Sequence, residues 1–251
     1  MVTTPAARIT LLDGFSLETG PAPHEGAVRG RGCALSPGVQ RLVAHVCLAE
    51  RTARPAVAGL LWPDVLDEQA LASLRSGLWR LRRAAPGLVE VSGEVLSLAG
   101  WVRVDVRELQ AWARRATDPG SDVEDVALPD VALRGELLPG WYDDWVLLER
   151  ERLRQLRLHA LEVAAGRLAA ARRYAEALEA AHLAVRAEPL RESAHRTLVR
   201  VHLAEGNPSE ALRAHRLFAQ LLRDELGVAP TERMAGLVRG LLPGRPGRVA
   251  C

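Results

Sequence analysis

The pattern of apolar and polar positions predicts an N-terminal half that begins with a hairpin, continues with three helices and ends with a second hairpin. Two short apolar runs are split by Asp13-Gly14, a dipeptide typical of hairpin turns. Apolar residues then recur at helical spacing until Gly87. The predicted elements are strands over 8–12 and 15–17, helices over 37–48, 53–61 and 68–86, and strands over 89–91 and 95–98. This order is that of a winged helix.

Local signals support the boundaries of these helices. Ser36 is a candidate N-cap in front of Pro37, which suits the first helical position. Trp62-Pro63-Asp64 ends the second helix, because a proline cannot continue it. Between the first hairpin and the first helix, residues 19–32 are rich in Gly and Pro and predict a loop, with one weak strand signal near Val28. The buried stripe expected for the first helix is Leu42, Val43, Val46 and Cys47.

The C-terminal half reads as nearly continuous helix interrupted by short breaks. Ala177-Leu178 recurs as Ala211-Leu212, which is 34 residues later and matches the period of tetratricopeptide repeats. Shared Ala-rich composition is the alternative explanation, but the breaks also recur at the same phase. After a polar loop over 117–129, the predicted helices cover 144–171, 174–187, 190–205, 208–226 and 231–241, with an earlier amphipathic helix over 107–116.

The sequence therefore predicts a mainly α protein built from two domains and a tail. An N-terminal winged helix of mixed α and β structure covers 1–103. An all-α, tetratricopeptide-like domain covers 104–243, and 244–251 form the tail.

The third predicted helix, over 68–86, is the strongest candidate for a functional surface. Leu71, Leu74, Leu78 and Leu81 recur at helical spacing and predict its buried stripe. From Gln69 to Val89 the sequence has no acidic residue. A helix with a cationic back suits the major groove of DNA, whereas a solvated basic surface would show the same pattern.

The candidate DNA contacts divide by their place on the chain. Ser73, Ser76, Arg80 and Arg83 are expected to face away from the leucine stripe, with Arg75 on the flank within reach of phosphate. Arg51 and Arg54 precede the second helix and could hold phosphates there. We interpret Trp79 as packed against the domain and not as stacked on a base. Arg82 lies near the stripe and could pair with Asp or Glu or touch DNA; we interpret it as structural.

Composition narrows the classes of function. The net charge of +2 is nearly neutral, so a nucleic-acid site must be a local patch. All 33 basic residues are Arg, and the absence of Lys excludes P-loop, Schiff-base and pyridoxal phosphate chemistry. Cys33, Cys47 and Cys251 fit no disulfide framework or zinc pattern. We interpret Cys47, two residues after His45, as a core cysteine and not as a metal ligand.

The remaining chemistry is sparse. His195 and His202 are seven residues apart and share a helix face, but no Glu or Cys completes a ligand set around them. We expect no enzyme activity, no catalytic residue, no cofactor and no metal. No apolar run reaches the roughly 18 residues of a membrane span, and the N-terminus lacks signal-peptide features. A soluble, cytoplasmic, nucleoid-associated protein with no membrane partner is the expectation.

With both halves in view, the chain resembles the small regulators of the Streptomyces antibiotic regulatory protein (SARP) family. Two matching segments lie in a winged helix of the response-regulator output (PhoB-like) type, at 60–64 and 74–83. Six more resemble the bacterial transcriptional activation domain, at 135–140, 144–146, 150–154, 188–192, 206–212 and 225–230. The wing turn departs from the pattern, because it carries Glu94 and no Arg, which leaves Arg103 as a candidate phosphate contact.

The resemblance implies a transcriptional activator of a secondary-metabolite (antibiotic) biosynthetic cluster. Its implied partners are double-stranded promoter DNA, bound at direct repeats as a side-by-side homodimer, and the RNA polymerase holoenzyme. The alternative is a helical-repeat scaffold that binds a protein or ligand and whose winged helix does not bind DNA. The near-neutral N-terminal half and the acidic wing tip support that alternative.

Overall fold

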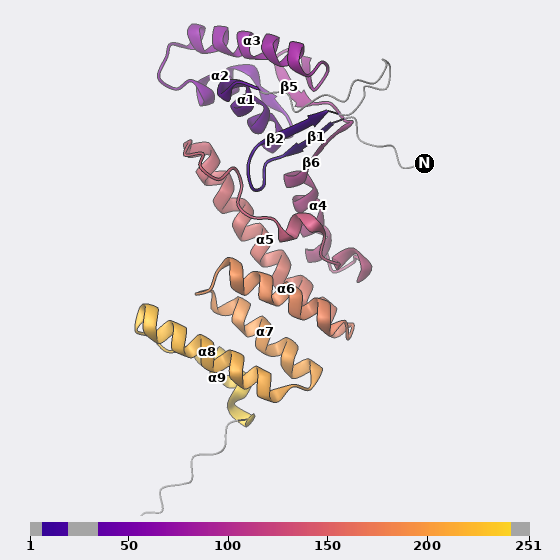
Figure 1. The fold of residues 1–251 in the computed structure, drawn as a ribbon, viewed down its shortest axis with the longest axis vertical. Coiled ribbons are helices and arrows are strands. Elements are labelled where there is room, and N and C mark those ends of the chain that lie inside the picture. Colours follow the sequence, from indigo (N-terminus) through magenta and orange to yellow (C-terminus); the bar gives the residue numbers. More distant parts are fainter. Residues whose placement is uncertain (1–6, 20–34, 242–251) are drawn as a thin grey trace, which may run out of the picture. The chain divides into compact units, whose positions relative to one another are not determined.

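The computed structural model describes residues 7–19 and 35–241 (Figure 1). The predicted tail, the strand signal near Val28 and nearly all of the predicted Gly- and Pro-rich loop lie outside this range. The chain forms two compact units that are interleaved along the sequence. The first comprises Met1–Ala111 and Asp130–Arg154, and the second Trp112–Pro129 and Gln155–Cys251. The domain boundaries at 103 and 243 divide the chain continuously and remain a prediction.

The first unit contains the predicted series of strands, three helices and a hairpin. The strands are β1 (Ala7–Thr10), β2 (Ser16–Thr19), β3 (Thr52–Ala53), β4 (Val89–Ser92), β5 (Val95–Leu98) and β6 (Val102–Val104). The helices are α1 (Pro37–Leu48), α2 (Arg54–Leu61) and α3 (Asp67–Ala84). They are followed by α4 (Asp105–Thr117), η2 (Asp130–Leu133) and α5 (Asp144–Ala170), of which α4 and α5 contribute residues to both units.

The first unit contains two three-stranded sheets, whose strand orders are β2-β1-β6 and β3-β5-β4. β1 and β2 form the predicted hairpin, with Asp13 and Gly14 both at positive φ in the turn. β4 and β5 form the second hairpin, and Gly93 takes a positive φ between them. β6 runs parallel to β1, and β3 runs antiparallel to β5. The sequence did not predict β3 or β6, and β3 takes the place of the expected start of the second helix.

A buried carboxylate joins the start of α4 to the first sheet. Asp105 accepts hydrogen bonds from the backbone N–H groups of Leu11 and Leu12, the shortest being 2.9 Å, and from that of Val106 at 2.7 Å. Burial raises the pKa of Asp105, although these three donors act in the opposite direction. The contact fixes β1 relative to the helix that follows β6.

Residues 130–154 belong to the first unit, and part of this segment pairs with the residues directly after β1. Leu12 and Leu137 form an isolated β-bridge, and Leu138 donates its N–H to the Leu11 carbonyl at 2.8 Å. Arg150 caps this segment, since its guanidinium donates to the carbonyls of Leu137, Leu138 and Trp141 at 2.8–2.9 Å. The segments at 135–140 and 150–154 that carry the family resemblance thus hold each other in place.

The second unit is helical. Besides parts of α4 and α5 it contains η1 (Glu124–Val126), α6 (Tyr174–Ala187), α7 (Glu192–Glu205), α8 (Pro208–Leu226), α9 (Glu232–Val238) and η3 (Arg239–Leu241). Helix α7 packs between α6 and α8, and α9 contacts both α7 and α8. Gly206 and Gly227 end α7 and α8 in left-handed conformations, as the predicted breaks require.

A buried cluster fills the space among α7, α8 and α9. Its members are Val199, Ala211, Phe218, Leu222, Met234 and Val238. The structure confirms three predictions: a mainly α protein, an N-terminal winged helix, and a helical domain that follows it in the sequence. None of the described helices is long and apolar enough to cross a membrane.

Candidate nucleic-acid interface

Helix α3 is the element that carries most of the predicted DNA contacts. Asp67 and Glu68 lie in its first turn, and Arg82 and Arg83 lie in its last. Both placements complement the helix dipole, which is positive at the N-terminus and negative at the C-terminus. After Ala85 and Pro86, Gly87 turns the chain with a φ of +73° into β4. The sequence thus marks where α3 begins and where it ends.

The buried face of α3 differs from the predicted leucine stripe. Leu74 and Leu81 are buried as expected, but Leu71 and Leu78 are only half-buried. Ala70 and Gly77 take their places. A Cβ on Gly77 would lie 3.5 Å from Leu42 Cδ2 of α1, so a small residue lets the two helices approach closely. The observed buried stripe is therefore rotated about the helix axis by part of a turn from the predicted one. Leu71 and Leu78 lie at its edges and not at its centre.

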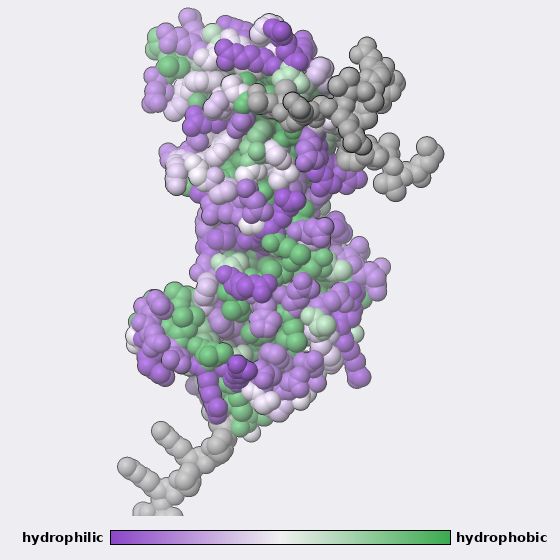
Figure 2. Space-filling model, in the orientation of Figure 1, coloured by the Kyte–Doolittle hydropathy of each residue, from purple (hydrophilic) through white to green (hydrophobic). Residues whose placement is uncertain are grey.

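The outer face of α3 is polar and cationic. Arg75, Ser76, Arg80 and Arg83 are exposed, as predicted, whereas Ser73 is half-buried. Among the described residues, the side chains of Arg75, Arg80 and Arg82 have no acidic partner and no hydrogen bond. Figure 2 shows a mostly hydrophilic surface over α3. Three guanidinium groups on one helix are thus free to meet an anionic ligand.

Two hollows border α3 on opposite flanks. One, of about 520 Å³, is lined by Ser73, Ser76 and Arg80 of α3, with Trp62 and residues of the α1 N-terminus opposite. The other, of about 400 Å³, lies between α3 and the β4–β5 hairpin. Its basic lining consists of Arg54, Arg75 and Arg82. The structure therefore sorts the predicted contacts into a Ser73–Ser76–Arg80 group and a separate arginine group.

Two interpretations of the sequence are wrong for this helix. Trp79 is not packed against the domain, because 59% of its surface is exposed and Arg83 lies over its ring at 4.9 Å. Arg82 is exposed and has no acidic partner in the described part of the chain, so it is not a structural ion-pair residue. Arg75 and Arg82 are seven residues apart and therefore lie on the same helix face. That spacing was a signal in the sequence that could have grouped them.

The two arginines predicted near the second helix occupy different positions. Arg51 is exposed just before β3. Arg54 is the first residue of α2 and donates its backbone N–H to the Glu94 carbonyl of the hairpin turn at 2.7 Å. Its Nε is buried and has no hydrogen-bond partner among the residues that the structure describes. Pairing of β3 with β5 is what brings Arg54 beside the hairpin.

The hairpin itself contributes no basic group. Glu90 and Glu94 are exposed, and Arg103, the alternative candidate, forms an ion pair with Glu108 at 3.6 Å. Because side chains alternate along a strand, Val89 and Val91 line the hollow while Glu90 points to the other face of β4. Glu90 therefore does not face the three arginines of the hollow.

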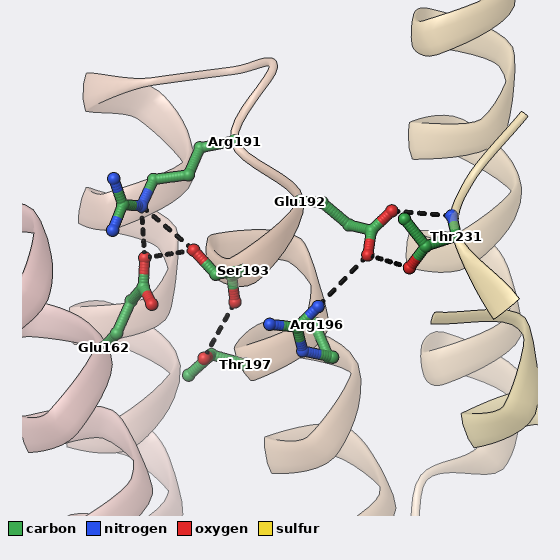
Figure 3. A network of polar contacts seen from close by, with 7 residues as sticks. All are labelled: Glu162, Arg191, Glu192, Ser193, Arg196, Thr197 and Thr231. Atoms are coloured by element: carbon green, nitrogen blue, oxygen red, sulfur yellow. Dashed lines mark hydrogen bonds and ion pairs between the residues drawn. The ribbon is translucent and has the colours of Figure 1, made fainter. Parts of the chain in front are cut away.

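In the second unit, Arg191 and Glu192 of the family resemblance take part in a network of polar contacts (Figure 3). Arg191 donates to Glu162 of α5 at 2.7 Å, and Ser193 donates to the same carboxylate at 2.8 Å. Glu192 binds Arg196 at 3.1 Å and accepts hydrogen bonds from the backbone N–H and hydroxyl of Thr231. The segment at 188–192 thus joins α5, α7 and the start of α9.

His45, His195 and Cys47 pack within the helical cores. His195 stacks on Phe218 with ring centroids 4.1 Å apart and hydrogen-bonds to the Pro189 carbonyl at 2.8 Å. Cys47 is fully buried, as predicted, and burial raises its pKa. His45 packs edge-on against Trp145, and burial lowers its pKa. Within residues 7–19 and 35–241, no three His, Cys, Asp or Glu side chains are arranged to hold a metal ion.

Comparison with known proteins finds similarity over both halves of the chain. The family model described as "Bacterial transcriptional activator domain" matches residues 103–242. The chain is 32% identical over 225 residues to regulatory protein AfsR of Streptomyces coelicolor. That match covers 84% of this chain, which spans only 22% of the length of AfsR.

A solved structure extends the similarity to the fold. Mycobacterium tuberculosis EmbR, in a complex with a low-affinity phosphopeptide, matches with a TM-score of 0.67 and 19% identity. The match covers 96% of this chain and 66% of the EmbR chain. At this identity the likeness concerns the fold alone. The similarity to AfsR supports the resemblance to the SARP regulators, and the match over residues 103–242 shows that the chain belongs to the bacterial transcriptional activator domain family.

Proposed function

We propose that the protein is a sequence-specific activator that binds double-stranded promoter DNA with helix α3 in the major groove. The observation that carries this proposal is the outer face of α3. It presents Arg75, Arg80 and Arg82 without acidic partners among the described residues. A groove about 12 Å wide admits one helix, and guanidinium groups bind both phosphates and guanine edges there.

The two flanks of α3 suggest different roles. Ser73, Ser76 and Arg80 line one hollow and are the candidates for contacts to base edges, together with Arg83 at the end of the helix. Arginine is the usual bidentate partner of guanine O6 and N7, and serine hydroxyls accept or donate at several bases. Arg75, Arg51 and Arg54 are the candidates for phosphate contacts, which set the position of the protein on the duplex.

The proposal also covers the arrangement of protomers on DNA and the protein that they recruit. We propose that two protomers bind direct repeats side by side and recruit the RNA polymerase holoenzyme at promoters of a biosynthetic cluster. Membership of a transcriptional activator family supports this. It also supports a cytoplasmic, nucleoid-associated protein without enzyme activity. The repeat character of α6 to α8 remains part of the proposal, supported by their consecutive packing.

Footprinting on the promoters next to the protein's own gene tests the proposal. We expect protected direct repeats whose spacing reports the arrangement of protomers. A titration by fluorescence anisotropy over a range of salt should show affinity that falls steeply with salt, since neutralised phosphates release counterions. No protection, together with weak binding that is equal on every duplex, would favour the scaffold alternative, which the acidic Glu90 and Glu94 support.

A further inference from the structure

The hollow between α3 and the β4–β5 hairpin has an exposed apolar wall. Trp79 is 59% exposed and Val91 is 45% exposed, and both line this hollow. The half-buried Leu78 and Val89 line it as well. Single exposed apolar residues are common, but a group of them rimmed by charge marks a groove for a ligand or partner. The proposed phosphate contacts use none of these four side chains, so they do not account for the wall.

Positive charge lies directly beside this wall. Arg54, Arg75 and Arg82 also line the hollow, and none of them has an acidic partner or a side-chain hydrogen bond among the described residues. The Nε of Arg54 is buried and has no partner in that part of the chain. A buried donor without an acceptor is unfavourable, and an anion in the hollow would supply one. The hollow thus combines an apolar half with an unbalanced cationic half.

The hollow has the size and the rigidity of a small-molecule site. Its volume is about 400 Å³, within the range of ~300–1,000 Å³ that is typical of ligand pockets. Arg54 is held beside the hairpin by the pairing of β3 with β5 directly before it. Arg75, Trp79 and Arg82 follow one another on α3 at intervals of four and three residues, which places them on one face. Arg83 lies over the Trp79 ring at 4.9 Å and restrains it.

We propose that this hollow binds a small amphiphilic organic anion, namely an aromatic carboxylic or sulfonic acid. Guanidinium groups present paired donors in one plane, which match the oxygens of such an anion. The attached aromatic ring would pack against Trp79 and the two valines of β4, and it would remove their apolar surface from water. A bare inorganic anion makes only the first of these contacts, so it is expected to bind less tightly.

Such a ligand would compete with DNA. Arg54 and Arg75 line the hollow and are also the proposed contacts to backbone phosphates, and one guanidinium group cannot serve both anions at once. Binding of the acid would therefore lower the affinity for promoter DNA and make the activator responsive to a small molecule. This consequence rests on the proposed function, whereas the binding of the acid does not.

A fluorescence titration of the full chain with 8-anilinonaphthalene-1-sulfonate, an aromatic sulfonate, tests the site. Saturable binding at one site is expected. Arg82→Ala removes a charge and should weaken binding about tenfold, and Val91→Ser removes part of the wall and should weaken it about fourfold. Both side chains are exposed, so these changes should leave the fold intact. Arg80→Ala, the matched control, removes the same charge from the same helix but from the other hollow, and should bind the probe like the wild type.

Two control compounds separate the parts of the ligand. N-phenyl-1-naphthylamine has the same rings without the sulfonate, and sodium sulfate supplies the anion without the rings. Sulfate binding is measured by displacement of the probe at constant ionic strength. Both compounds should bind more weakly than the aromatic sulfonate, because each reaches only one half of the hollow.

A second arm measures competition with a promoter duplex that carries a far-red dye. The fluorescence anisotropy of the duplex should fall as the sulfonate occupies the hollow. Val91→Ser keeps all three arginines, and the same displacement should require about four times as much sulfonate in this variant. If the wild type binds no duplex, the proposed function fails, and the first arm alone decides the ligand site.

Two results overturn the proposal. In the first, the sulfonate binds without saturation, or with an affinity that Arg82→Ala and Val91→Ser leave unchanged. In the second, either control compound binds as tightly as the aromatic sulfonate, which would leave one half of the hollow without a role. Saturable, variant-sensitive binding that does not displace the duplex keeps the ligand site and contradicts its competition with DNA.

Discussion

At the scale of single residues, Gly77 decides how closely α3 approaches α1. A methyl group there would lie in ordinary contact with Leu42, at 3.5 Å, whereas a larger side chain would not fit. We predict that Gly77→Ala keeps or raises the free energy of unfolding by up to about 1 kcal/mol, since glycine is a poor helix former. Gly77→Leu should lower it by about 1–3 kcal/mol through overpacking.

Urea unfolding followed by circular dichroism measures both changes. A Gly77→Leu variant as stable as the wild type would show that α3 and α1 do not meet at this position.

Asp105 supports a second prediction. Its carboxylate accepts three backbone N–H groups in a buried setting, and an amide at this position would direct two of its own hydrogens at donors. Asp105→Asn should therefore lower the free energy of unfolding by about 1–3 kcal/mol. Asp118→Asn is the control, because Asp118 is exposed and accepts one local hydrogen bond from Gly120. Equal stability of the two variants would contradict the assigned role of Asp105.

The sequence predicted exposure better than contact at this scale. Arg75, Ser76, Arg80 and Arg83 are exposed as expected, because a helical period alone determines which side chains face away from a core. It could not show that Ala70 and Gly77 replace Leu71 and Leu78 on the buried face. That depends on the shape of α1, which lies some thirty residues earlier in the chain.

At the scale of elements, Glu192 links the start of α9 to α7. It accepts two hydrogen bonds from Thr231, which is the N-cap residue of α9. We predict that Glu192→Ala increases amide hydrogen exchange over 231–238 more than elsewhere in the second unit, since local opening reports lost anchoring. Glu210→Ala is the control, because the exposed Glu210 meets Arg213 only at 4.0 Å. Uniform exchange changes in both variants would contradict this role.

Helix positions were predictable and short strands were not. The ranges of α1, α6 and α8 match the predicted ranges, because residues that mark helix boundaries lie beside them. Pro37 begins α1, Pro189 follows the end of α6, and Gly206 and Gly227 border α8. β3 and β6 have only two and three residues, and their partners are distant in sequence. Strands of this kind exist only through non-local pairing, which hydrophobic periodicity does not report. The arginine hollow depends on β3, so its assembly was hidden for the same reason.

At the scale of the whole molecule, four histidines make stability dependent on pH. Burial is the largest cause that lowers the pKa of His45, His182, His195 and His215 below 6.5. In the unfolded chain these groups bind protons near pH 6.5, whereas the folded chain resists protonation. Their contribution to stability is therefore complete above the unfolded pKa and is lost as the pH falls below it.

We predict that the free energy of unfolding decreases between pH of about 7.5 and about 5.5. Denaturant titrations that resolve the two units measure it. His215→Leu removes a buried ring nitrogen that has no hydrogen-bond partner in the described part of the chain, and it should weaken this pH dependence. Stability that is constant or rises toward lower pH would contradict the burial of these rings.

The central claim is that the outer face of α3 binds DNA and reads its sequence, and affinity measurements on single arginine variants test it most directly. Arg80→Ala and Arg83→Ala are compared with Arg223→Ala, an exposed arginine of α8 without an acidic partner among the described residues. Fluorescence anisotropy on the footprinted promoter repeat should show binding weakened by about 1–3 kcal/mol for a contact to a base edge, with relaxed sequence preference. Arg223→Ala should bind like the wild type. Unchanged affinity and unchanged preference in both α3 variants at physiological salt would contradict the claim.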